Sequence, residues 1–245
     1  MKKIVLTVLT AMVSIAIILV GFFMIKGMTQ KVKNPIATIQ IEGYEKPIKI
    51  ELDVQSAPNA VSNFIKLANQ GFYNDYKMTI SDGKLTCAED KKAKMSNLQE
   101  NPQKDYTYGI KGDFKVNDVD NLIRHEKGVI TMERDDYSYF GYAKEGYNSA
   151  NSKFSILTKD NSNLNGLYAA FGKIIEGMDV LEAIAATRVD TTSGDTTEKN
   201  ANTIKIKSIT VDTFGADYGI PDVVNNDETT NKVNQIYQQH FGGSN

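Results

Sequence analysis

The pattern of hydrophobic and polar positions predicts β-strands at two places in the chain. Between residues 36 and 52, apolar and polar residues alternate on either side of a turn at Gly43, which is typical of a hairpin with one buried face. Residues 203–211, TIKIKSITV, alternate in the same way and predict a final strand. Elsewhere short strands and glycine turns follow one another without the regular helices that a parallel sheet needs. The pattern therefore favours a mainly β protein built on a closed antiparallel barrel.

Two segments have helical spacing instead. In residues 57–73, Val61, Phe64 and Ile65 recur at helical intervals, and in residues 177–187 the apolar residues also share one face. We expect both helices to be amphipathic and to cap the barrel.

An apolar run precedes the barrel. Residues 4–25 contain no charged residue and would span roughly 33 Å as a helix, at about 1.5 Å per residue, which is enough to cross a bilayer. No small-residue cleavage site follows, so we interpret the run as an uncleaved transmembrane anchor and not as a cleaved signal peptide. Lysines flank it on both sides and decide the orientation poorly. We expect a single-pass protein of the cell membrane with its main domain outside the cytoplasm, a side that suits an almost cysteine-free domain, although many cytosolic domains would look the same.

These patterns divide the chain into four expected parts. They are the anchor at 1–27, a linker at 28–34, the barrel domain at 35–215 and a polar tail at 216–245. In the tail we expect at most a short helix around Lys232 to His240.

Composition excludes several classes of function. A hydrophobic content of 41% is enough for a sizeable core, and a formal charge of −2 gives no reason to expect nucleic acid as a partner. Cys87 is the sole cysteine of the sequence, which excludes an internal disulfide and a cysteine-based zinc site. The two histidines, His125 and His240, are too isolated for a metal cluster. We expect neither a metal nor a cofactor.

Four stretches, in this order, carry a family resemblance. They are APNAVSNFIKLANQGFY, YGIKGDFKVNDVDNLIRHEKGVITM, NSANSKFSIL and LNGLYAAFGKIIEGMDVLEAI. Together they resemble a cyclophilin-type peptidyl-prolyl cis-trans isomerase of the bacterial kind over about residues 36 to 212. The most specific stretch is the last, where six residues stand at the family's spacing: Leu164, Gly166, Phe171, Gly172, Gly177 and Met178.

The resemblance implies a fold and a mechanism. The fold is an eight-stranded barrel capped by two helices, and the partners are unfolded or proline-containing polypeptides. Rotation about an X-Pro bond faces a barrier of roughly 18 to 20 kcal/mol. The family is understood to lower it with an arginine that donates hydrogen bonds to the prolyl amide, an apolar pocket for the proline ring, and a glutamine with backbone groups that hold the neighbouring residues.

The pocket of this chain departs from that pattern at most positions. Met78, Thr79 and Ile80 replace the family's Phe-His-Arg, so Ile80 holds the arginine position. In the following segment, Leu85, Thr86 and Ala88 stand for the family's Phe, Met and Gln. After Met132, Glu133 stands for a small residue and Arg134 holds the next place, and Lys153, Phe154 and Ser155 stand for Gln-Phe-Phe. Asn163 stands for the tryptophan of some members, Leu164 keeps its apolar character, and Tyr168 stands for an edge aromatic or histidine. The stretch around Leu85 is one residue short, so its register stays open.

These departures leave two functions open. The first is a cyclophilin-type isomerase of low activity that assists the folding of exported proteins, with Lys153 or Arg134 as substitute cations for the arginine. A lysine lacks the planar fork of a guanidinium, and a solvated charge at a pocket rim is the commoner role. The second is a non-catalytic module that binds extended or proline-containing segments of a partner.

Three further features can be interpreted as purely structural. His125 is expected to make a structural hydrogen bond, and Cys87 to pack as a small apolar residue. Residues 135–147 form a loop rich in tyrosine. Its rings either make a binding surface or fold onto the barrel, and both alternatives stay open.

Overall fold

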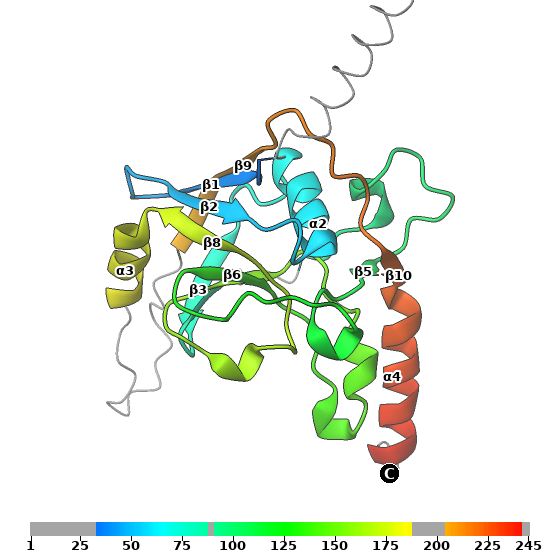
Figure 1. The fold of residues 1–245 in the computed structure, drawn as a ribbon. Helices are drawn as coiled ribbons and strands as arrows, with labels where there is room; N and C mark the ends of the chain where they lie inside the picture. Colours follow the sequence, from blue (N-terminus) through cyan, green and yellow to red (C-terminus); the bar gives the residue numbers. More distant parts are fainter. Residues whose placement is uncertain (1–32, 88–90, 188–203, 242–245) are drawn as a thin grey trace, which may run out of the picture. The chain divides into compact units, whose positions relative to one another are not determined.

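The structure is a computed structural model that describes residues 33–87, 91–187 and 204–241. It contains a closed barrel of eight strands in the order β1-β2-β8-β6-β7-β4-β3-β9 (Figure 1). The strands are β1 (Ile36–Ile41), β2 (Ile48–Leu52), β3 (Lys77–Ser81), β4 (Lys84–Cys87), β6 (Val129–Met132), β7 (Phe154–Leu157), β8 (Ala170–Glu176) and β9 (Ile204–Asp212). All neighbouring strands are antiparallel, and the expected mainly β barrel is confirmed.

The hairpin and both capping helices lie where the sequence predicts them. β1 and β2 form the hairpin, and every second residue of each strand is buried. The helices are α2 (Pro58–Asn69) and α3 (Met178–Ala186). α2 places Phe64 in the core, where its ring centroid lies 5.4 Å from that of Phe154 and 5.3 Å from that of Phe171. The aromatic residues therefore join α2 to the barrel.

An acidic side chain holds the first turn of α2. Asp113 accepts hydrogen bonds from the backbone N–H of Ala60 (2.8 Å) and from the side chain of Asn59 (2.9 Å). A negative charge at a helix N-terminus is favourable, but Asp113 is only 1% exposed, and burial raises its pKa to about 6.

The chain after the barrel is more ordered than the sequence predicts. β10 (Val223–Asn225) pairs antiparallel with β5 (Tyr108–Ile110), and α4 (Asn226–Phe241) follows directly. The side chain of Asn225 accepts hydrogen bonds from the N–H groups of Asp227 and Glu228, and so caps α4. The expectation of at most a short helix near the end of the tail is wrong, because a cap and a strand partner distant in sequence supply the order.

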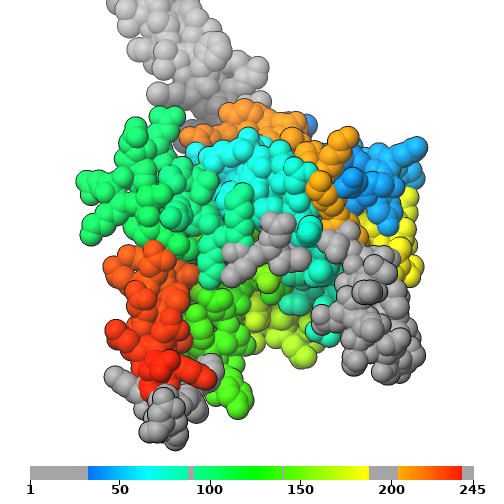
Figure 2. All heavy atoms as spheres, turned by 180° about the vertical axis from the view of Figure 1, so that it is seen from behind, coloured from blue at the N-terminus to red at the C-terminus, as the bar shows by residue number. Residues whose placement is uncertain are grey.

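α4 lies against the loop that is rich in tyrosine. Lys232 on α4 forms an ion pair of 3.2 Å with Glu145 on the short 3-10 helix η4 (Ala143–Gly146). Figure 2 shows α4 in red at the surface, next to green segments of the chain.

The expected anchor at residues 4–25 lies outside the described residues. Among the helices that the structure describes, none is long and apolar enough to span a membrane.

Candidate functional site

Three neighbouring strands of the barrel, β4, β7 and β6, present a row of hydroxyl groups on their outer face. Thr86 lies opposite Ser155, and Ser155 lies opposite Thr131. On β3, Thr79 lies opposite Thr86 and so shares this face. Directly opposed residues of paired strands point to the same side of a sheet. This face contains the predicted groove positions Thr86 and Ser155.

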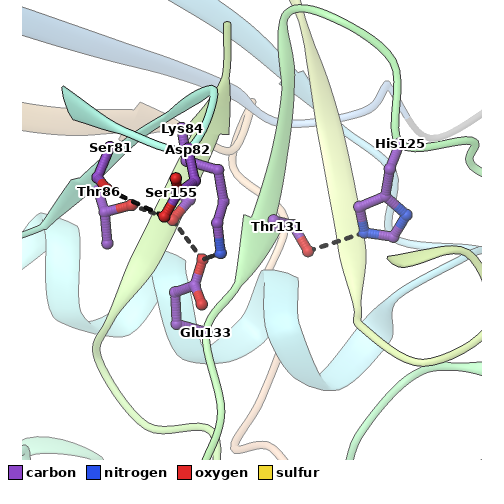
Figure 3. A network of polar contacts seen from close by, with 8 residues as sticks. All are labelled: Ser81, Asp82, Lys84, Thr86, His125, Thr131, Glu133 and Ser155. Carbon is purple, nitrogen blue, oxygen red and sulfur yellow. Dashed lines mark hydrogen bonds and ion pairs between the residues drawn. The ribbon is translucent and has the colours of Figure 1, made fainter. Parts of the chain in front are cut away.

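A polar network fills the face between these strands (Figure 3). Lys84 Nζ lies 2.7 Å from Glu133 Oε1, and Ser155 Oγ donates a hydrogen bond of 2.5 Å to the same oxygen. The hydroxyls of Thr86 and Ser155 are 2.7 Å apart, and Thr86 is the donor because Ser155 gives its proton to Glu133. Ser155 is fully buried, and the side chains of Lys84 and Glu133 are 22% and 16% exposed. Polar side chains therefore occupy the face where the resemblance places the apolar proline pocket.

His125 contacts the same face at Thr131 (Figure 3). Its Nε2 lies 3.1 Å from Thr131 Oγ1, and its Nδ1 lies 3.1 Å from Oδ1 of Asn165. The ring is 2% exposed, and burial lowers the pKa of His125 below its ordinary value, so the neutral imidazole is favoured. Both ring nitrogens are engaged within the protein, which agrees with a structural role.

The inner face of the same strands belongs to the core. Leu85 and Phe154 are fully buried, so they support the groove from beneath and cannot line an open surface. Ile80 lies opposite Leu85 and packs against the core cluster. On β3, therefore, Thr79 faces outward and Ile80 inward. Neither residue carries a guanidinium.

Leu164 and Asn163 lie on the short 3-10 helix η5 (Ser162–Leu164) at another edge of this face. Leu164 is half-buried and packs with Ile123 against a small outer-face cluster of Val129, Leu157 and Ala170. Asn163 is exposed. Only the leucine therefore offers an apolar wall.

Arg134 is held by its surroundings. Its guanidinium carbon lies 4.5 Å from the ring centroid of Tyr168, and Nε and Nη1 donate hydrogen bonds to the carbonyl oxygens of Leu167 (3.0 Å) and Asp135 (2.9 Å). Burial raises the pKa of Tyr168. The guanidinium thus stacks on the predicted edge aromatic, and two of its nitrogens are already bound.

Lys153 is exposed at the end of β7 and borders a pocket of about 140 Å³ that it shares with Glu133 and Arg134. Two further cations, Lys91 and Lys92, line the same pocket. Sequence reasoning missed these two lysines and Lys84. The alternation of Lys84, Leu85 and Thr86 is a signal for an outward lysine, but only the pairing with β7 shows which carboxylate it meets.

The rings of the loop rich in tyrosine do not all follow one of the two alternatives, a binding surface or packing onto the barrel. Tyr147 packs edge-on against Phe114 at 5.8 Å between ring centroids, whereas Tyr139 is 90% exposed. Some rings therefore fold onto the domain while Tyr139 faces solvent.

Ala88 lies outside the described residues. Cys87 is fully buried in the core, as expected. In the described part of the chain, no group of three or more His, Cys, Asp or Glu residues is placed to hold a metal ion.

Comparisons with known proteins agree on one family. The family model described as "Cyclophilin type peptidyl-prolyl cis-trans isomerase/CLD" matches residues 36–211. Among curated proteins, peptidyl-prolyl cis-trans isomerase A of Dickeya dadantii is 30% identical over 149 residues, 58% of this chain and 68% of the relative. Peptidyl-prolyl cis-trans isomerase cyp18 of Streptomyces antibioticus is 25% identical over 174 residues, 65% and 89% of the two chains.

A solved structure shows the same fold. The cyclophilin type peptidyl-prolyl cis-trans isomerase of Cryptosporidium parvum superposes with a TM-score of 0.54 at 20% identity, covering 74% of this chain and 98% of that one.

Proposed function

Because the chain belongs to the cyclophilin-type peptidyl-prolyl cis-trans isomerase family, we propose that it binds extended, proline-containing segments of polypeptides and isomerises them only weakly. The observation that carries this proposal is the network of Lys84, Glu133, Ser155 and Thr86 on the outer face of β4, β7 and β6.

The chemistry of the reaction explains the expected weakness. A catalyst of prolyl isomerisation must bind the twisted amide better than the planar one, and a preorganised donor does this without a nucleophile or a metal. Neither Thr79 nor Ile80 offers a guanidinium. Loss of one preorganised donor typically costs about 10² to 10³ in rate. In addition, the proline ring meets hydroxyls and an ion pair, which are poor partners for an apolar ring.

The two substitute cations differ in how well they could act. Arg134 is stacked on Tyr168 and bonded to two carbonyl oxygens, so turning it toward a bound amide would break these contacts. Lys153 is exposed and can move, but its ammonium is a flexible point donor. Of the two, Lys153 is the better candidate for residual turnover.

A second candidate function is a non-catalytic binding module. The Lys84–Glu133 ion pair favours it, because a proline ring could enter this part of the face only by displacing a mostly buried, bonded pair. A polypeptide that crosses the face through backbone hydrogen bonds leaves the pair in place.

The apolar run at residues 4–25 supports a proposal for the setting of this activity. We place the protein in the cell membrane with its main domain outside the cytoplasm, where its clients are exported polypeptides. Protease added to intact cells should then digest the main domain. Full protection of that domain, with digestion only after lysis, would reverse the orientation.

One experiment separates the two candidate functions. NMR exchange spectroscopy on short Ala-Pro peptides mixed with the full chain reports binding through shift changes and catalysis through cis–trans exchange peaks. Binding with weak exchange supports an isomerase of low activity, and binding with exchange at the uncatalysed rate supports the module. Absence of any shift change rejects both.

A further inference from the structure

A small pocket opens beside the outer-face network and shares Glu133 with it. It has a volume of about 140 Å³, and its lining includes four cations, Lys91, Lys92, Arg134 and Lys153, against two carboxylates, Glu133 and Asp135. Most small-molecule sites measure roughly 300 to 1,000 Å³, so a single side chain of a bound polypeptide suits this pocket better than a cofactor does.

The floor of the pocket is already satisfied by hydrogen bonds within the protein. The side chain of Asn151 accepts from the N–H of Ala93 (2.6 Å) and donates to the carbonyl oxygens of Ala93 (3.0 Å) and Tyr108 (2.6 Å). Ser152 Oγ donates to the carbonyl oxygen of Lys91 (2.7 Å). Because these polar groups are already hydrogen-bonded within the protein, the charged side chains of the lining are left to select a bound side chain.

The charged side chains of the pocket differ in whether they interact with a partner in the protein. Glu133 is paired with Lys84, and the ammonium of Lys91 lies 4.6 Å from the ring centroid of Phe72. Lys92 and Lys153 are exposed, and within the described residues neither forms an ion pair. Lys84 pairs with Glu133, so Asp135 is the one carboxylate of the lining without an ion pair among the described residues, and it accepts a hydrogen bond from the hydroxyl of Tyr137.

From this imbalance we infer that the pocket takes an acidic side chain, Asp or Glu, of a polypeptide lying in the neighbouring groove. The inference rests on the proposed function and names the class of segment that the groove selects. The attraction comes from the cations of the described lining, which outnumber its two carboxylates. Complementary charge of this kind contributes more to selection and to the rate of association than to affinity.

The test is a binding series on the full chain. The probes are fluorescein-labelled peptides with a central Ala-Pro and one Glu, Gln or Lys at each flanking position in turn. At one position, Glu should bind about threefold to fivefold more tightly than Gln, since an exposed ion pair contributes at most about that factor. Lys should bind more weakly than Gln, and added salt at about 1 M should remove the preference for Glu.

Variants locate the effect. Lys153→Gln and Lys92→Gln should each reduce the preference for Glu, and Asp135→Asn should increase it. Lys207→Gln on β9 removes an exposed lysine outside the pocket and should leave the preference unchanged. Binding without any preference among Glu, Gln and Lys overturns the inference and leaves the proposed function standing. Absence of binding by every peptide overturns both.

Discussion

Ser155 Oγ donates a hydrogen bond of 2.5 Å to Oε1 of Glu133, and the same oxygen lies 2.7 Å from Lys84 Nζ. The resemblance places a phenylalanine at the position of Ser155 and a small residue at the position of Glu133. In this chain, Ser155 and Glu133 form a hydrogen-bonded pair on the outer face of the barrel, next to Lys84.

The Lys84–Glu133 pair should be energetically coupled. Lys84→Met and Glu133→Gln should each lower the free energy of unfolding by about 1 to 3 kcal/mol, since each leaves one mostly buried charge without its partner. The double variant should lose about 1 kcal/mol less than the sum of the two losses. Urea unfolding of all four proteins measures this coupling. Additive losses would mean that the pair does not interact.

The orientation of β3 can be tested with two matched variants. Ile80→Arg should lower the free energy of unfolding by about 2 kcal/mol or more, because Ile80 packs against the core cluster. Thr79→Arg, on the outer face opposite Thr86, should change it by less than about 1 kcal/mol. Thermal unfolding of both variants gives the comparison. A reversed order of stability would show that the register of β3 and β4 is misassigned.

His125 should make stability fall at acid pH. Burial lowers the pKa of His125 in the folded protein, so the unfolded chain binds a proton more readily. The stabilisation from the neutral ring is complete above about pH 6.5, the ordinary histidine value, and is lost as the pH falls below it. His125→Gln should remove this part of the pH dependence, which unfolding curves between about pH 5 and 7.5 would reveal. An unchanged dependence would mean that folding does not shift the pKa of His125.

Asp113 should have the opposite effect to His125 on the pH dependence of stability. Its pKa in the folded protein is raised to about 6 from 3.8, so the folded protein binds the proton more readily. Its contribution to stability is therefore present below about pH 4 and is lost as the pH rises to about 6, a loss of up to about 3 kcal/mol.

Asp113→Asn tests this sign. The variant should gain stability relative to the parent protein as the pH rises through that window, with the exposed Glu45→Gln as the control for a changed net charge. A difference that stays constant with pH would mean that the carboxyl is not titrating there.

Local pattern predicts β1, β2 and β9 and the helices α2 and α3, because their apolar faces are encoded within short stretches. Local pattern predicts only part of α4 and does not predict β10, because β10 is short and pairs with β5, more than a hundred residues earlier in the chain. Asn225 followed by Asp227 and Glu228 was a readable capping signal inside a polar segment.

The site was predictable in its residue types and not in its contacts. Ser155 and Glu133 stood out by position, but their hydrogen bond depends on the register of β6 and β7. Lys84 enters the network through the pairing of β4 with β7, and Arg134 is diverted by Tyr168, a residue far away in sequence. Such long-range pairings decide whether a charge faces a bound peptide or another side chain.

The most direct test of the account is the value of kcat/KM for an Ala-Pro peptide, measured in a protease-coupled isomerisation assay on the full chain. Peptidyl-prolyl cis-trans isomerase A of Dickeya dadantii serves as the reference under the same conditions. The account predicts a value lower than the reference by a factor of about 10² or more. A value equal to that of the reference would contradict it, because efficient turnover would then occur with isoleucine at position 80 and with the Lys84–Glu133 pair on the outer face.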